Sequence, residues 1–275
     1  MVDKSEKFSW LVRVGYFSRA ILYFVLGLVA LTSADKIAEG TNGIFRAIDG
    51  YPGGTVILWI MVIGLFAYAL FRFCSPLFDI ENQGSDGKGW AKRIGHAGSG
   101  IAHLVLAYSA FKFATSGGSG SSGGSGGEGG GGGAQQAASG VLSMEFGGAL
   151  LGILGLAFFI AAIFQVKKGI TGEFMNRISG QAPSATRWLG GAGYVARGVV
   201  YTVIGWSLFK AGFMSGGAEQ IKTLGDAVAS LAGEGFIFTL TAIGLMLFGL
   251  FSLVLARYRI IPELDSDAGI PKFRA

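Results

Sequence analysis

The sequence predicts an all-α integral membrane protein, with six transmembrane helices arranged as three tandem helical hairpins with pseudo-threefold symmetry. Two features of composition and one pattern lead to this prediction. Of the 275 residues, 51% are hydrophobic and only 14% are charged, which is too few charges to cover the surface of a soluble domain. The apolar residues form long stretches between short charged ones, and a similar pair of stretches occurs three times.

Six apolar stretches approach the roughly 20 residues that a helix needs to cross about 30 Å of hydrocarbon. The spans are expected near residues 14–33, 54–74, 94–114, 147–167, 190–212 and 235–256. The third stretch is the least apolar because His96, His103 and Lys112 interrupt it. We expect the first stretch to be retained as a span, since no clear cleavage site of small residues follows it.

Lysine and arginine are divided unevenly between the two ends of these spans. The amino terminus, the loops after the second and fourth spans and the carboxyl end together contain 15, whereas the opposite side contains five. The positive-inside rule therefore predicts a multi-pass protein of the cell (inner) membrane with both termini in the cytoplasm. We interpret the net charge of +5 as topology, and we expect no nucleic-acid partner.

Residues 116–133 are glycine and serine apart from one glutamate. Such a segment has no apolar group to bury, so we expect a flexible loop on the outer side. A phosphate-binding loop would need a Lys-Ser/Thr pair or a strand–helix unit, and neither follows. Cys74 is the only cysteine, which excludes an intramolecular disulfide, a cysteine zinc site and an iron–sulfur cluster.

The internal repeat is marked by glycines in both helices of each hairpin. In the first helix, a glycine follows a tryptophan by five residues, at Gly15, Gly95 and Gly193. The second helix contains Gly-Leu-x-x-aromatic, after a short amphipathic stretch and a glycine-rich turn, as at residues 43–54 and 224–235. We expect parallel repeats at residues 1–80, 81–178 (with the loop 116–133) and 179–275, related by an axis along the membrane normal.

These patterns resemble the bacterial membrane proteins grouped as domain of unknown function 1206. The resemblance rests on Trp-x4-Gly-Tyr-x2-Arg in the first helix and Gly-Leu-x-x-aromatic in the second, and it covers nearly the whole chain. It implies three two-helix repeats and six spans, and it implies no activity. The middle repeat departs from the pattern, with histidine and serine in place of tyrosine and arginine and with the long Gly/Ser insert.

Offsets of one, four and eight from the repeat glycine fall at about 100°, 40° and 80° around a helix, so each set forms one stripe. If the first helices surround the axis, the three stripes converge. The candidate ligand-binding residues are Tyr16, Arg19, Tyr23, His96, Ser99, His103, Tyr194, Arg197 and Tyr201. An arginine at this depth costs roughly 2.5–3.5 kcal/mol unless it is paired or hydrated. No Asp or Glu lies within a span, which leaves tyrosine, backbone carbonyls, water or an anion as partners.

Three interpretations of the stripes stay open. The first is structural, with Tyr and Trp in an interfacial belt and the arginines reaching outward to the interface. The second is a pocket for an anion or a lipid headgroup, lined by Arg19, Arg197, His96 and His103. The third is a conduction path along the axis.

The composition of the spans favours a protein without catalytic activity, metal or cofactor. His96 and His103 are the only histidines, and about 10.5 Å of helix separates them, so they cannot bind one metal ion together. No carboxylate pair or Ser–His couple is evident at span depth. We expect a scaffold or accessory subunit that binds lipid or another membrane protein. A small-solute or anion channel is the second hypothesis, and a cofactor-binding redox subunit is the third.

Overall fold

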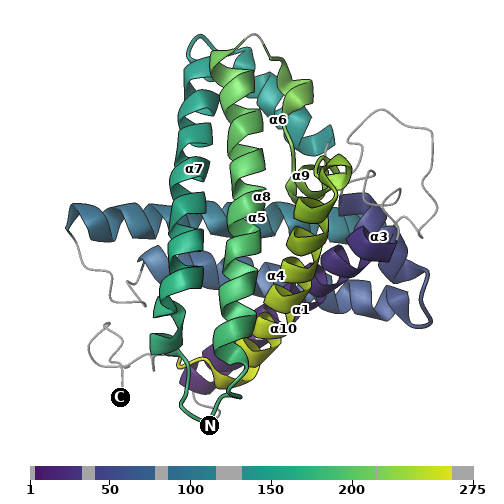
Figure 1. The fold of residues 1–275 in the computed structure, drawn as a ribbon, viewed down its shortest axis with the longest axis vertical. Helices are drawn as coiled ribbons and strands as arrows, with labels where there is room; N and C mark the ends of the chain where they lie inside the picture. Colours follow the sequence, from purple (N-terminus) through teal and green to yellow (C-terminus); the bar gives the residue numbers. More distant parts are fainter. Residues whose placement is uncertain (1–3, 33–40, 78–85, 116–131, 215, 262–275) are drawn as a thin grey trace.

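The computed structural model describes residues 4–32, 41–77, 86–115, 132–214 and 216–261. Within these ranges the chain forms helices and turns, together with one isolated antiparallel bridge between Ile178 and Arg259. Figure 1 shows long helices joined by short ones. The predicted all-α class is therefore confirmed for the described part of the chain.

Six long helices overlap the six predicted spans. They are α1 (Lys4–Thr32), α4 (Gly54–Leu77), α5 (Gly87–Thr115), α7 (Gly147–Thr171), α8 (Thr186–Phe213) and α10 (Phe236–Tyr258). Short helices lie between them: α3 (Thr41–Asp49), α6 (Gly132–Leu142), η1 (Glu173–Arg177), η2 (Ala218–Gln220), α9 (Leu224–Ala229) and η3 (Ala232–Glu234). The expected loop 116–133 falls outside the described residues, except that Gly132 and Gly133 begin α6.

Among the described residues, four helices are long and apolar enough to cross a membrane, over Val12–Thr32, Gly54–Cys74, Gly147–Thr171 and Phe236–Tyr258. Large apolar side chains cover their outer faces; on α7, for example, Ile153, Ile160 and Ile163 are all more than half exposed. A continuous apolar surface of this kind is unfavourable in water and favourable against acyl chains. The chain is thus a membrane protein. Helices α5 and α8 are equally long but more polar.

The short amphipathic stretches predicted before two of the second helices are confirmed as α3 and α9. Helix α3 buries Ile44, Phe45 and Ile48 on one side. A capping box between Thr223 and Asp226 begins α9. Glycines with positive φ, Gly53 at +80° and Gly235 at +50°, then turn the chain into α4 and α10, a backbone conformation that other residues rarely adopt.

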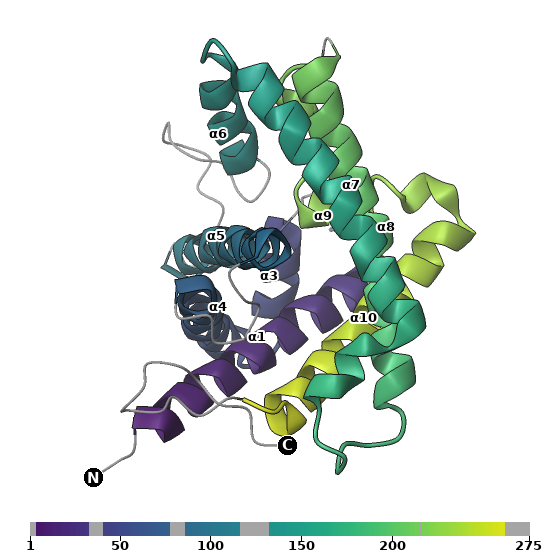
Figure 2. The same ribbon diagram turned by 90° about the vertical axis from the view of Figure 1, so that its left-hand side faces the viewer.

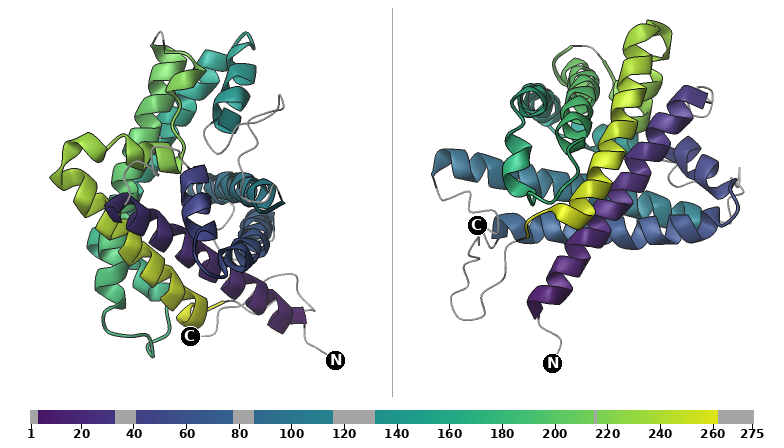
Figure 3. Two further views of the ribbon diagram at one scale, coloured as in Figure 1. Left: turned by 90° about the vertical axis from the view of Figure 1, so that its right-hand side faces the viewer. Right: turned by 60° about the horizontal axis from the view of Figure 1, so that its bottom comes forward.

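The long helices pair in a cyclic order. Helix α4 packs along α5, α7 along α8 and α10 along α1, so the second helix of each repeat lies against the first helix of the next, and the last lies against the first. Figures 2 and 3 show α1 and α10 side by side. The three pairs are inclined steeply to one another: α7 and α8 run vertically in Figure 1, whereas α4 and α5 run across them.

An arginine near the start of each first helix donates hydrogen bonds to carbonyl groups at the end of the second helix that packs along it. The last carbonyl groups of a helix have no hydrogen-bond partner within it, and they form the negative end of its dipole. A guanidinium group supplies both hydrogen-bond donors and a positive charge. The bonds run from Arg13 to Ala256 and Arg257 (α10), from Arg93 to Pro76 (α4), and from Arg187 to Gly169 and Ile170 (α7). The pairs are therefore antiparallel, with the start of each first helix beside the end of a second helix.

Packing within the repeats differs between the middle one and the outer two. Helix α1 packs on α4 and α8 packs on α10, but between the described parts of α5 and α7 there is no comparable packing. A Cβ added to Gly15 would lie 2.7 Å from the Cβ of Tyr68, and one added to Gly193 would lie 2.6 Å from the Cβ of Phe248. A Cβ added to Gly95 meets nothing within 4 Å. The middle repeat thus lacks the close contact expected of a hairpin.

Candidate functional site

Two buried aromatic residues on the second helices form the centre of a cluster of tyrosine and arginine side chains. Tyr68 on α4 and Phe248 on α10 are the aromatic residues of the Gly-Leu-x-x-aromatic pattern, and both are fully buried. The ring of Tyr16 meets Tyr68 edge-on at 5.3 Å between centroids, and Tyr23 meets Phe248 at 4.9 Å. The ring of Tyr194 also meets Phe248, at 5.5 Å between centroids. Tyrosines from α1 and α8 therefore meet around these two rings.

Arg19 on α1 points into this centre. The residue is only 5% exposed, and its Nη1 donates to the Tyr68 hydroxyl at 2.9 Å while its Nε donates to Oγ of Ser252 at 3.1 Å. Its guanidinium also lies 4.7 Å from the Tyr16 ring and 5.0 Å from the Phe248 ring. Tyrosine as a partner is therefore confirmed. Arg19 does not reach outward to the interface, because it is buried and its hydrogen-bond partners lie on α4 and α10.

Arg197 occupies on α8 the position that Arg19 occupies on α1, and it also contacts the Phe248 ring. Its guanidinium carbon lies 4.6 Å from the Phe248 centroid and 5.4 Å from that of Tyr23, and the Tyr201 hydroxyl accepts a hydrogen bond from its Nη2. Arg19 and Arg197 thus lie around one ring on α10. We call Tyr16, Arg19, Tyr23, Tyr68, Arg197, Tyr201 and Phe248 the arginine–tyrosine core.

The arginine–tyrosine core has more positive charge than its own groups compensate. Two buried N–H groups, on Nη2 of Arg19 and Nε of Arg197, have no acceptor among the described residues. Two further guanidinium groups lie close by, that of Arg72 at 5.2 Å from the Tyr68 ring and that of Arg259 at 5.3 Å from the Tyr16 ring. Burying a charge without an opposite one is costly, so the N–H groups of Arg19 and Arg197 that lack an acceptor are suited to an anion.

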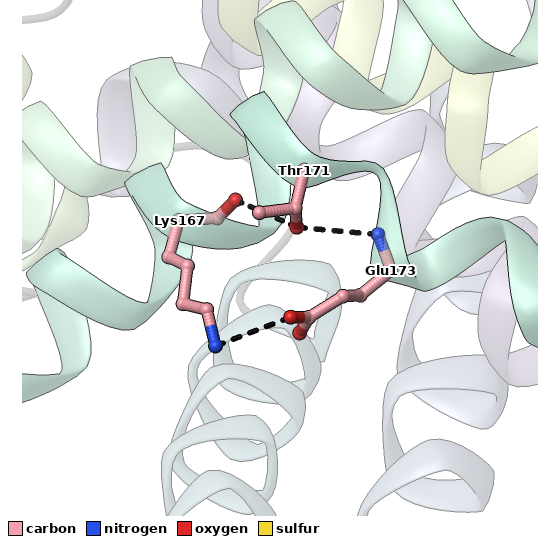
Figure 4. Close-up of polar contacts among 3 residues, drawn as sticks. All are labelled: Lys167, Thr171 and Glu173. Atoms are coloured by element: carbon pink, nitrogen blue, oxygen red, sulfur yellow. Dashed lines mark hydrogen bonds and ion pairs between the residues drawn. The ribbon is translucent and has the colours of Figure 1, made fainter.

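No carboxylate is paired with Arg19 or Arg197 within the described ranges. An ion pair does form at the exposed end of α7, where Nζ of Lys167 lies 3.2 Å from the Glu173 carboxylate. Figure 4 shows this pair with Thr171, whose hydroxyl donates to the Lys167 carbonyl and accepts from the backbone N–H of Glu173. Both charges of this pair are about half exposed, as is usual at a membrane surface, and they leave the buried arginines uncompensated.

The middle repeat reaches the arginine–tyrosine core through His103. Its side chain is buried and its ring meets Tyr68 at 4.6 Å, while Nδ1 donates to the Ser99 carbonyl at 2.6 Å. Ser99 thus contributes a backbone oxygen. His96 lies about one helical turn before Ser99 and is half-buried. Tyr68 therefore separates His103 from Arg19. Among the described residues, no three His, Cys, Asp or Glu side chains are grouped as metal ligands.

Most of the predicted stripe is gathered in one place. Six of the nine candidates contact Tyr68 or Phe248, and Tyr201 joins them through Arg197; the six are Tyr16, Arg19, Tyr23, His103, Tyr194 and Arg197. The prediction missed Ser252, Arg72 and Arg259, the last two because they were counted only as charges that set topology. Tyr68 and Phe248 were recognised as part of the repeat but not as residues that contact the arginines. Their equivalent positions in the second helices could have indicated a shared role.

Comparison with known proteins accounts for the threefold pattern. The family model described as Domain of Unknown Function (DUF1206) matches residues 14–78, 94–172 and 192–259. The chain belongs to the DUF1206 family. Each matched segment contains most of the two long helices of one repeat, so the predicted tandem arrangement is confirmed.

A curated relative extends the likeness over nearly the full length. This DUF1206 protein is 28% identical over 269 residues to "Uncharacterized protein YxxB" of Bacillus subtilis (strain 168), an alignment that covers 93% of the chain and 94% of the relative. No solved structure matches the chain.

Proposed function

We propose that this DUF1206 protein is a non-catalytic membrane protein, a scaffold or accessory subunit, that binds an anion in the arginine–tyrosine core. The observation that carries the proposal is the pair of guanidinium groups on α1 and α8, which share the Phe248 ring, each have a buried N–H without an acceptor and are paired with no carboxylate in the described part of the chain. The ligand is a phosphate or carboxylate group, presented by a membrane lipid or by a small anion.

The electrostatics of the core support this assignment. Two like charges repel strongly where water is excluded, and tyrosine hydroxyls and ring faces offset only part of that cost. A phosphate or carboxylate oxygen accepts from several guanidinium N–H groups at once, and such charge-assisted bonds are about twice as strong as neutral ones. The free N–H groups of Arg19 and Arg197 supply these donors.

We further propose that all six long helices cross the membrane, as three repeats related by a pseudo-threefold axis, with both termini in the cytoplasm. Helices α5 and α8 have 29 and 28 residues, more than the roughly 20 that a span needs. Each pairs along a helix that is apolar enough to span, α4 and α7 respectively. The cyclic pairing of second with first helices and the three arginine caps support the threefold relation.

Substitution of Arg19 and Arg197 tests anion binding. We expect Arg19→Gln and Arg197→Gln each to weaken binding of inorganic phosphate and of phosphatidylglycerol by about tenfold to a hundredfold, because a hydrogen bond to a charged group contributes about 1.5–3 kcal/mol. Binding is measured by native mass spectrometry in mild detergent and by the shift in unfolding temperature on adding the ligand. Arg257→Gln, at the exposed end of α10, is the matched control.

Two results would contradict the proposal. One is a folded Arg19→Gln/Arg197→Gln double variant that binds both ligands as tightly as the wild type. The other is a wild-type protein that binds neither ligand. Anion flux into proteoliposomes that depends on Arg19 and Arg197 would instead assign these residues to a conduction path.

A further inference from the structure

The two sides of the arginine–tyrosine core differ in polarity along the helices. We call the side on which the first helices start the terminal side, and the opposite side the distal side. On the distal side of Arg19, Leu26 and Ala30 follow it by seven and eleven positions, so they lie within about 20° of it around α1. They are 0% and 1% exposed. Beyond Tyr23, the face of α1 that contains Arg19 is therefore apolar and buried.

The same arrangement is found on α8 and α4. Ile204 and Leu208 follow Arg197 by the same seven and eleven positions, and both are buried. On α4, which runs in the opposite direction, the residues three, seven and ten positions before Tyr68 are all 0% exposed. These residues belong to one buried cluster, and we call six of them the apolar layer: Leu26, Leu58, Met61, Leu65, Ile204 and Leu208.

The hydroxyl groups near the apolar layer do not provide a route for an ion. Distal to the core, the described buried residues include Thr241 on α10 and Ser207 on α8. The Ser207 hydroxyl already donates to the Ile204 carbonyl at 2.8 Å and accepts from the backbone N–H of Lys222 at 3.1 Å. None of the described residues buried on this side is charged. An anion in the apolar layer would therefore lose its water without gaining a cationic partner, which is unfavourable.

Two short helices lie beyond the apolar layer. Helices α3 and α9 contact each other and α1, while α3 also contacts α4, and α9 contacts α8 and α10. Figure 1 shows the two next to each other. Their inward residues are each at most 2% exposed and are Ile44, Phe45 and Ile48 on α3 and Ala227 and Val228 on α9. Two successive levels of packed apolar side chains thus close the distal side of the core.

On the terminal side, guanidinium groups lie between the core and the surface. Arg259 lies 5.3 Å from the Tyr16 ring, which in turn lies 4.7 Å from the Arg19 guanidinium. Arg72 lies 5.2 Å from the Tyr68 ring, which Arg19 also contacts. Arg72 and Arg259 are both partly exposed. Apolar residues are buried on this side as well, among them Val12 and Leu255. Cationic groups accompany them here, whereas the distal side has only apolar side chains and the two hydroxyl groups.

We infer that an anion reaches the arginine–tyrosine core from the terminal side only, and that the apolar layer with α3 and α9 closes the core toward the distal side. This inference rests on the proposed function and adds the compartment from which the ligand comes. With both chain ends in the cytoplasm, the ligand is a phosphate or carboxylate group of the cytoplasm or of the inner leaflet. The core is then a one-sided binding site and not part of a path across the membrane.

Binding of inorganic phosphate from one side at a time tests the inference. The full chain, with an affinity tag at its carboxyl end, is reconstituted at low density into phosphatidylcholine vesicles. Vesicles that display the tag are then separated from those that enclose it. We expect intact tag-outward vesicles to bind at least about tenfold more labelled phosphate than intact tag-inward vesicles, since transfer of an ion across an apolar layer is strongly unfavourable. Detergent should make the two equal.

The same measurement separates this inference from the proposed function. Equal phosphate binding by the two kinds of intact vesicle would overturn one-sided access and leave anion binding in place. Absence of phosphate binding after detergent treatment would overturn the proposed function, and this inference with it.

Two positions on α4 test the apolar layer itself. Met61 is 0% exposed and Ile63 is 62% exposed, so Met61→Ser changes the layer and Ile63→Ser is the matched control. We expect Met61→Ser to admit water and to raise phosphate binding by tag-inward vesicles several-fold above that of Ile63→Ser. Binding by tag-outward vesicles shows that a variant is folded. If Met61→Ser is not folded, Leu26→Ala tests the layer by leaving a cavity. Folded variants with no more tag-inward binding than Ile63→Ser would overturn the role of the apolar layer.

The source of the ligand is distinguished by adding phosphatidylglycerol to the same vesicles. Reduced phosphate binding by tag-outward vesicles would show that the lipid headgroup takes the site. Unchanged binding would show that the site takes a free anion. Both results agree with access from the terminal side, whereas a change in tag-inward vesicles alone would contradict it.

Discussion

Arg19 and Arg197 remain inside the protein because aromatic rings and hydroxyl groups replace part of the water that each guanidinium loses. Phe248 provides a ring face to both, and Tyr68 provides Arg19 with an acceptor as well as a ring. A cation over an aromatic face gains about 0.5–2 kcal/mol, depending on desolvation. This compensation is partial, which is why we assign the remaining donors to an anion.

Removal of the Tyr68 hydroxyl tests how much one hydrogen-bond acceptor of Arg19 contributes to the stability of the protein. Tyr68→Phe keeps the ring and leaves a buried N–H of Arg19 without its acceptor, so we expect a loss of about 1–3 kcal/mol in the free energy of unfolding. The measurement is chemical denaturation in detergent followed by intrinsic fluorescence. Tyr108→Phe, which removes a hydroxyl from an exposed tyrosine, should cost almost nothing. An equal loss in the two variants would contradict the assigned role of the Tyr68 hydroxyl.

At the scale of the helix, the same glycine position has two different environments. In α1 and α8 it allows the second helix of the repeat to approach until backbone and Cβ atoms are nearly in contact, whereas in α5 it faces open space. The difference arises because the described parts of α5 and α7 do not pack closely on each other. One position of the repeat therefore has a packing role in the outer repeats and leaves a surface in the middle one.

Alanine substitutions at these glycines should have opposite effects. We expect Gly15→Ala and Gly193→Ala to destabilise the protein by about 1–3 kcal/mol each, because the new methyl group overlaps Tyr68 or Phe248 and the helices must separate. Gly95→Ala should be neutral or stabilise it by about 0.5–1 kcal/mol, since alanine favours the helix and meets no neighbour. Thermal unfolding in one detergent compares the three variants. Destabilisation by Gly95→Ala as large as by Gly15→Ala would contradict the absence of a close neighbour at Gly95.

For the whole molecule, the cyclic pairing places the start of every first helix beside the end of a second helix. This arrangement is compatible with repeats that all enter the membrane from one side. It also brings the first and last long helices together, since Arg13 on α1 binds the end of α10. In the described chain, α5 and α7 are the neighbouring helices that lack such close packing.

The side of the membrane on which residues 116–131 lie distinguishes six spans from four. If α5 and α8 cross the bilayer, this segment is extracytoplasmic; if only the four most apolar helices cross, it is cytoplasmic. We expect a protease site inserted there to be cleaved from outside in spheroplasts, while tags at both chain ends stay protected, as the excess of Lys and Arg on the terminal side predicts. Protection of the inserted site, with cleavage only after lysis, would contradict six spans.

Particular elements show how far prediction from the sequence could reach. The stripe on α1 was predictable because the angles of Tyr16, Arg19 and Tyr23 around a helix follow from their spacing alone. The acceptors of Arg19 were not, because Tyr68 and Ser252 lie 49 and 233 residues away in the chain and meet it only after the helices pair. Likewise, nothing in the spacing of Gly95 indicated that its face would stay uncovered.

The sequence by itself determined the helical class, the places of the long apolar helices, the short amphipathic helices and the tandem repeat, because hydropathy and periodicity act over neighbouring residues. Only the tertiary structure decided that α10 pairs with α1, that Phe248 contacts two arginines and that the described parts of α5 and α7 do not pack closely on each other. Those outcomes depend on which helix surfaces pack together between distant parts of the chain. Because three similar repeats present nearly the same surfaces, the sequence pattern alone does not distinguish one pairing from another.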